Sequence, residues 1–193
     1  MAEKRMTQEK LLLALLRKSL NGSKEYGLTG RELAYAKGCD WAQLAETARR
    51  HGVLPLLYDT LHELPVPQDV LMRTERQSRM IVRQNYRLFV LSKQLTEAFE
   101  KRQIPVVLLK GVATASLYPT PELRKSGDID ILLLDPSMLQ EARRCLEDLG
   151  CSVEEWQPSL HHIIFALPSV KIEVELHTML AEPFDDRRVN ALL

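Results

Sequence analysis

The sequence predicts an α+β protein, in which an N-terminal helical region precedes a small mixed β-sheet with helices packed on one side. Residues 1–103 repeat apolar side chains at helical spacing, whereas residues 104–193 contain short apolar runs typical of buried strands. The two ranges also differ in charge: the first carries 18 Lys and Arg against 12 Asp and Glu, and the second 8 against 14. We therefore expect a helical region at 1–103 and a separate core at 104–193.

Three helices are expected within the first 61 residues. One spans about residues 8–20, with Asn21-Gly22-Ser23 as its stop signal, and a second runs from an Asp40 N-cap to about Arg50. A third, shorter helix covers about residues 54–61. The first helix carries leucines at helical spacing, namely Leu11, Leu12, Leu15, Leu16 and Leu20.

A long helix is expected from about Gln68 to Arg102, because this stretch follows the proline-containing breaker at 64–67 and contains neither glycine nor proline. Its buried stripe comprises Ile81, Leu88, Leu91, Leu95 and Phe99. Five arginines at spacings of three or four form a basic stripe on the same helix: Arg73, Arg76, Arg79, Arg83 and Arg87. Such a stripe is typical of a solvated face or a docking face, and less often of nucleic-acid binding.

The second region begins with a strand at 104–109, which Lys110-Gly111 ends, followed by a helical turn at 113–117. A second strand is expected at 128–134. Asp135 and Pro136 are the N-cap and first residue of a helix that ends at Gly150. Three more strands follow at about 151–156, 161–167 and 170–177, and the last two form a hairpin.

Two aspartates, Asp128 and Asp130, stand at the start of the second strand of this region. Side chains alternate along a strand, so both carboxylates are expected on one face. Adjacent carboxylates repel each other unless a cation joins them, which points to a divalent metal, most simply magnesium with a phosphate-bearing substrate. Glu173 and Glu175 share one face of the last strand, and either could complete a three-carboxylate cluster if this strand pairs beside the Asp128 strand.

Two basic positions could contact phosphate. Gly111 lets the backbone approach a ligand, and Lys110 beside it could touch the phosphates of a nucleotide, although the dipeptide by itself is more typical of a surface turn. Arg124 could hold phosphate or pair with a buried acid. Separately, His161, His162 and His177 could form a transition-metal site with Glu175, but no helical or paired-cysteine ligand spacing supports zinc. The favoured role of His177 is to orient a carboxylate or to lie near the nucleotide.

Three blocks of sequence resemble the uncharacterised nucleotidyltransferase family of the polymerase-beta-like superfamily. They are Leu108-Leu109-Lys110-Gly111, then Arg124 with Gly127-Asp128-Ile129-Asp130, and then Val174-Glu175-Leu176-His177. The resemblance is close over about residues 104–180. Superfamily members usually have Gly-Ser where this chain has Lys110-Gly111. Family members are often longer, so the resemblance allows for a missing C-terminal helical part after residue 193.

The resemblance implies a magnesium-dependent enzyme, with manganese as an alternative ion, that moves an NMP group from an NTP to an acceptor and releases pyrophosphate. By this resemblance Asp128, Asp130 and Glu175 are the catalytic metal ligands, and Lys110, Gly111, Arg124 and His177 contact the nucleotide. Glu175 could also accept the proton of the nucleophile. The acceptor, whether a small molecule, a protein or an RNA end, is not specified by the sequence, and nucleic acid is not favoured.

Two other functional classes stay open. The chain could be a non-catalytic nucleotide-binding or regulatory module that retains the fold, although three retained acids argue against a dead site. It could also be a complex-forming protein whose arginine-striped helix is the interface. Three cysteines without ligand spacing, no secretory leader pattern and no apolar run near 20 residues favour a cytoplasmic location without membrane insertion.

Overall fold

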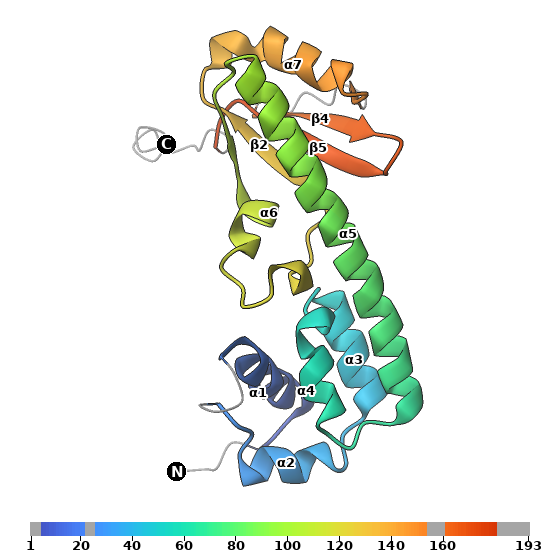
Figure 1. Ribbon diagram of the computed structural model, residues 1–193. Helices are drawn as coiled ribbons and strands as arrows, with labels where there is room; N and C mark the ends of the chain where they lie inside the picture. Colours follow the sequence, from blue (N-terminus) through green and yellow to red (C-terminus); the bar gives the residue numbers. More distant parts are fainter. Residues whose placement is uncertain (1–4, 22–25, 154–160, 181–193) are drawn as a thin grey trace, which may run out of the picture. The chain divides into compact units, whose positions relative to one another are not determined.

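The computed structural model describes residues 5–21, 26–153 and 161–180, and these form two compact units (Figure 1). Residues 1–85 and 115–125 belong to the first unit, and residues 86–114 and 126–193 to the second. The mixed α+β architecture confirms the predicted fold class. The predicted domain boundary between residues 103 and 104 stays a prediction. The two compact units are defined by contacts within each unit, and this does not show whether residues 1–103 or 104–193 fold alone.

The first unit is built from helices around an apolar core. Its elements are α1 (Gln8–Asn21), α2 (Gly30–Ala36), α3 (Trp41–Arg50), a 3-10 turn at Leu54–Leu57, α4 (Tyr58–His62), the first part of α5 (Gln68–Lys101) and a 3-10 turn at Pro121–Leu123. The core side chains include Leu11, Leu15, Trp41, Leu44, Leu54, Leu57 and Leu61. The helices predicted at 8–20, 40–50 and 68–102 are thus confirmed to within two residues.

Helix α2 was not predicted, although its sequence carries a clear start signal. Thr29 is the N-cap: the Glu32 backbone N–H donates to Thr29 Oγ1 at 3.3 Å, and the Thr29 backbone N–H donates to Glu32 Oε2 at 2.6 Å. This reciprocal pair is a capping box, and the Thr-x-x-Glu spacing could have identified it.

The second unit holds a five-stranded mixed sheet in the order β1-β2-β5-β4-β3. Its strands are β1 (Val106–Leu108), β2 (Ile129–Leu133), β3 (Ser152–Val153), β4 (His162–Leu167) and β5 (Ile172–His177). Strands β2 and β5 are parallel and the other neighbours are antiparallel. The predicted hairpin of the last two strands is confirmed. The strand expected at 151–156 is described only for 152–153, because residues 154–160 lie outside the described part.

Helices α5 and α7 (Leu139–Asp148) cover one face of this sheet (Figure 1). Leu88, Leu95 and Phe99 of α5 form one buried core with Cys145 and Leu146 of α7 and with the inward side chains of the strands. Alternation along β2 and β5 therefore leaves the polar side chains of both strands on the opposite face. One helix start differs from the prediction, because Asp135 caps a 3-10 turn at Pro136–Met138 that precedes α7. Helix α6 (Lys110–Ala115) contains a non-helical residue, Gly111, near its start.

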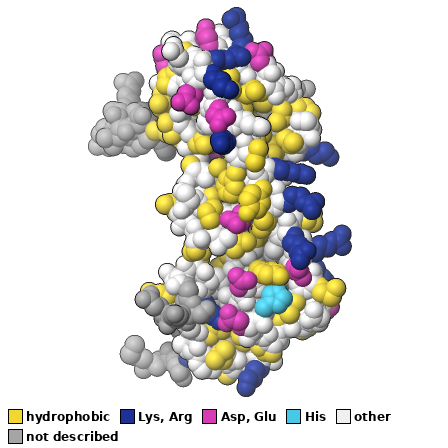
Figure 2. Space-filling view, in the orientation of Figure 1, with side chains coloured by type: hydrophobic (Ala, Val, Ile, Leu, Met, Phe, Trp, Pro, Cys, Tyr) yellow, Lys and Arg dark blue, Asp and Glu magenta, His cyan; other side chains and the backbone are white. Residues whose placement is uncertain are grey.

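The arginines predicted to form a stripe are all exposed along α5. Figure 2 shows Lys and Arg side chains along this side of the molecule. The five arginines are Arg73, Arg76, Arg79, Arg83 and Arg87. Arg79 pairs with Glu75, and Arg73 lies 4.0 Å from Asp69. Exposed pairs of this kind contribute little to stability, so the stripe behaves as a solvated face in the described structure. No helix among the described residues is long and apolar enough to cross a membrane.

Candidate active site

The pairing of β2 with β5 brings together acids that lie far apart in the sequence. Asp130 and Glu175 are register partners in these parallel strands, and Leu132 is the partner of His177. Register partners share a face of the sheet, so Asp130, Glu175 and His177 project from the face opposite α5 and α7. One ligand atom from each of the three lies within 4.8 Å of the others. Glu173, the other acid that was considered, is exposed.

Asp130 is a buried carboxylate with unequal oxygens. Its side chain has no exposed surface, and Oδ1 accepts from Lys110 Nζ at 2.9 Å and from His177 Nε2 at 3.1 Å. Oδ2 is buried and has no hydrogen-bond partner among the described residues. An unsatisfied buried carboxylate oxygen is unfavourable, which makes this atom a natural position for a cation that is supplied from outside the chain.

Lys110 and Gly111 reach Asp130 because of the antiparallel pairing of β1 with β2. Leu108 is opposite Ile131, and the next residue, Leu109, donates its backbone N–H to the Asp130 carbonyl at 2.9 Å. The chain then turns at Gly111, whose φ of 43° lies in the left-handed region that favours glycine. A Cβ at Gly111 would lie 3.6 Å from the Asp128 carbonyl oxygen and 3.9 Å from Asp130 Oδ2, so any other side chain here would pack directly beside this buried oxygen.

The charges in this group shift one another's pKa values. Burial and the neighbouring Asp130 carboxylate raise the pKa of Glu175 above its ordinary value. The hydrogen bond to Asp130 raises the pKa of Lys110, so its ammonium group stays charged. His177 Nε2 lies 3.2 Å from Glu175 Oε2 as well as 3.1 Å from Asp130 Oδ1, so one imidazole N–H faces two carboxylates. His177 therefore orients both acids.

Asp128 lies outside this compact group, and Arg124 is part of the other unit. Asp128 is half-buried one residue before β2, and among the described residues its carboxylate is in neither cluster of ligand atoms. Its charge still acts on the site, because it contributes to the raised pKa values of Lys110 and Glu175. Arg124 belongs to the first unit, where its guanidinium carbon lies 5.8 Å from the centre of the Tyr118 ring. Metal binding by Asp128 and phosphate binding by Arg124 stay predictions.

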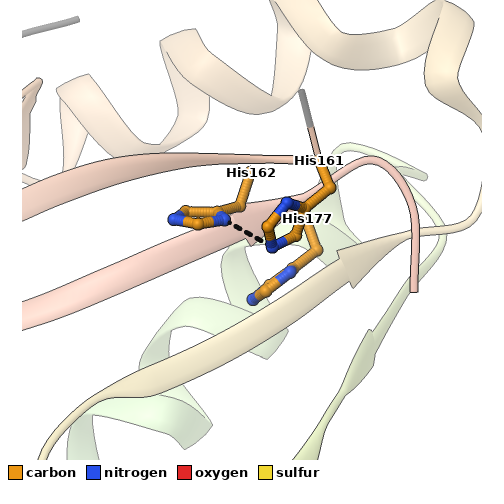
Figure 3. A group of neighbouring side chains, drawn as sticks. All are labelled: His161, His162 and His177. Carbon is orange, nitrogen blue, oxygen red and sulfur yellow. Dashed lines mark hydrogen bonds between the residues drawn. The ribbon is translucent and has the colours of Figure 1, made fainter. Parts of the chain in front are cut away.

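Three histidines form a second cluster that shares His177 with the acids. One ring nitrogen each of His161, His162 and His177 lies within 4.8 Å of the others (Figure 3). Burial lowers the pKa of His162, and the neighbouring His161, His177 and Lys110 lower it further. The sequence-based hypothesis had combined these histidines with Glu175, whereas the structure separates an acidic group from a histidine group.

Comparison with known proteins places the chain in a protein family but matches no individual characterised protein. Residues 37–192 match the family described as uncharacterised nucleotidyltransferase. The chain belongs to this nucleotidyltransferase family. No curated protein and no solved structure gives a significant match. Membership supports nucleotidyl transfer with a nucleotide substrate, and the matched range includes every residue of the acidic group.

Proposed function

We propose that this nucleotidyltransferase has the polymerase-beta-like mechanism and transfers an NMP group from an NTP to an acceptor hydroxyl, releasing pyrophosphate. The observation that carries the proposal is Asp130: a fully buried carboxylate beside Glu175 with one oxygen unpartnered among the described residues. A purely structural ion pair would satisfy both oxygens. An oxygen left without a donor at the centre of a cluster of acids supports a binding role instead.

The donor set fits magnesium, with manganese as the alternative. Hard divalent cations prefer carboxylate oxygens, and Asp130 Oδ2 and the Glu175 carboxylate are such oxygens, with Asp128 half-buried one residue before β2. When bound, such an ion supplies neutralisation of the triphosphate charge and a lowered pKa for the acceptor hydroxyl. Lys110 already neutralises part of the charge on Asp130, and its side chain is 60% exposed, so it can turn towards a phosphate.

The residues around the acids have separate roles in this proposal. Gly111 places no side chain between the backbone and Asp130, and Lys110 supplies a positive charge there. His177 holds the two carboxylates in place through Nε2. Arg124 is the proposed second phosphate contact, because it precedes Asp128 by four residues and carries a guanidinium group that binds phosphate.

Glu175 is the proposed general base. Its carboxylate lies beside Asp130 within the acidic group, and in the metal-free protein burial and the Asp130 carboxylate raise its pKa above that of an ordinary glutamate. The acceptor oxygen forms a bond to the α-phosphorus, its proton moves to Glu175, and the bond from the α-phosphorus to the bridging oxygen breaks. Pyrophosphate leaves with that oxygen, so atoms and charge balance without an oxidant or a reductant.

The proposal is tested by incubating the protein with each of the four NTPs, labelled at the α-phosphate, together with magnesium or manganese and a cell extract. We expect a labelled product that depends on the metal. A protein that is stabilised by a metal–nucleotide complex but yields no product from any NTP would instead be a nucleotide-binding module. Absence of both binding and product would remove the enzymatic interpretation.

The remaining inferences concern the cellular location of the protein and the acceptor substrate. Three free thiols, of which Cys145 and Cys151 are buried, fit a reducing compartment, and we infer a cytoplasmic location. The acceptor is a small molecule, a protein or an RNA end. Exposed arginines on α5 provide positive charge for an RNA acceptor, and the exposed Tyr86 lies on the same helix between Arg83 and Arg87.

A further inference from the structure

The histidine cluster lies at the junction of β4 and β5. His162 is the register partner of His177 in this antiparallel pair, so the two side chains lie on one face of the sheet. His161 immediately precedes β4, and its carbonyl accepts from the Thr178 backbone N–H at 2.8 Å, which ties the start of β4 to the end of β5. His161 lies outside β4, so the alternation of side chains along the strand does not apply to it. Its ring can therefore lie on the same face of the sheet as the ring of His162.

His177 has the hydrogen-bond pattern of a metal-ligating histidine. Nε2 faces the Asp130 and Glu175 carboxylates, which only accept, so this nitrogen carries the proton. In the neutral imidazole Nδ1 then holds a lone pair, and this atom is buried without a hydrogen-bond partner among the described residues. Histidine ligands characteristically donate one ring N–H to a carboxylate while the other nitrogen binds the metal. The side chain is 6% exposed, so the lone pair cannot simply be solvated.

We propose that His161, His162 and His177 form a binding site for a borderline divalent transition metal such as zinc, separate from the carboxylate site. Their ring nitrogens approach within 4.8 Å of one another, and Figure 3 shows the three rings gathered at one place. His161 Nε2 and His162 Nδ1 lie 2.9 Å apart and share one proton. Two nitrogens that bind one tetrahedral zinc ion are about 3.3 Å apart. Replacing the shared proton by zinc therefore requires only a small outward movement of the two imidazole rings.

The ligand chemistry distinguishes this site from the proposed magnesium site. Neutral imidazoles prefer zinc, cobalt, nickel or copper, whereas the carboxylates of Asp130 and Glu175 prefer magnesium or manganese. Asp130 links the two sites, because its Oδ1 accepts from His177 while its Oδ2 has no partner in the described part of the chain. Three protein ligands would leave a fourth position on the metal for water or a substrate oxygen. The inference does not depend on nucleotidyl transfer.

The test uses cobalt(II) as the probe, added to the full chain after metal removal and without nucleotide. We expect one equivalent to bind, with visible absorption bands characteristic of nitrogen ligation, and zinc but not magnesium to displace it. The double variant His161→Gln/His162→Gln should bind cobalt at least tenfold more weakly. His51→Gln, which alters an exposed histidine in the first unit, is the matched control and should bind as the wild type does.

Asp130→Asn separates the two proposed sites. Its amide oxygen still accepts from His177, so cobalt binding should persist even though the carboxylate site is lost. The inference is overturned if the wild type binds no cobalt, if the double variant binds it as tightly as the wild type, or if Asp130→Asn abolishes binding. Should the double variant fail to fold, His161→Gln alone gives the same readout, because His161 is only half-buried and lies outside β4.

Discussion

Replacing Asp130 with asparagine should stabilise the metal-free protein. The ligand oxygens of Asp130 and Glu175 lie within 4.8 Å of each other. With both groups ionised, at an effective dielectric constant of about 20, that separation corresponds to about 3.5 kcal/mol of repulsion. Lys110 Nζ lies 2.9 Å from Asp130 Oδ1, but its side chain is largely exposed, so a dielectric constant near that of water gives about 1.4 kcal/mol of attraction.

The difference predicts that Asp130→Asn raises the free energy of unfolding by about 2 kcal/mol at pH 8 in the presence of a chelator. The asparagine oxygen retains the hydrogen bonds from Lys110 and His177, so the comparison isolates the charge. Urea unfolding followed by circular dichroism measures the change, and hydrogen exchange of peptides from β2 and β5 assigns it to the second unit. The variant should also lose any stabilisation by magnesium with ATP or GTP.

Glu173→Gln is the matched control, because it makes the same carboxylate-to-amide change at an exposed position of β5. Its free energy of unfolding should stay within about 0.5 kcal/mol of the wild type. If Asp130→Asn instead lowers the free energy of unfolding by about 2 kcal/mol or more, the hydrogen bonds from Lys110 and His177 outweigh the repulsion between Asp130 and Glu175. Asp130 would then be a structural residue, and the argument for a binding role would fail.

Three further changes test separate parts of the structure. Because burial and the Asp130 carboxylate raise the pKa of Glu175 in the folded state, its contribution to metal-free stability should be fully present below the ordinary glutamate pKa and should be lost as pH rises through the raised value. Glu175→Gln should remove this part of the pH dependence of unfolding, and an unchanged slope would contradict the assignment. Gly111→Ala should lower stability by about 1–2 kcal/mol in urea unfolding, because its positive φ strains any other residue. Thr29→Ala should cost about 1 kcal/mol, measured the same way, through loss of the capping box with Glu32, and no change would refute that cap's importance.

The sequence predicts the elements of this fold well where spacing and caps agree. The leucine repeat of α1, the Asp40 cap of α3 and the uninterrupted α5 all follow local rules, and their bounds match the structure closely. Helix α2 was missed because its seven residues are too few for a periodic apolar stripe, so the capping box was the only strong signal.

The site is less accessible to sequence reasoning because it depends on which strands become neighbours. Alternation along β5 predicts that Glu175 and His177 share a face, but only the β2–β5 register places Glu175 beside Asp130 and leaves Glu173 exposed. Likewise, the ion pair of Lys110 with Asp130 depends on the β1–β2 register, and no local spacing indicates it. Strand order is set by packing across the whole sheet, beyond what short-range patterns specify.

Transfer of an α-phosphate label from an NTP tests the central claim most directly, measured in parallel for the wild type, Asp130→Asn and Glu173→Gln with magnesium and the same extract. The proposed mechanism predicts product from the α-label and none from the γ-label. It also predicts at least a thousandfold slower rate for Asp130→Asn, which corresponds to about 4 kcal/mol of lost transition-state stabilisation, and a rate within about twofold of the wild type for Glu173→Gln. Transfer of the γ-label, or an Asp130→Asn rate within tenfold of the wild type, would contradict nucleotidyl transfer at this site.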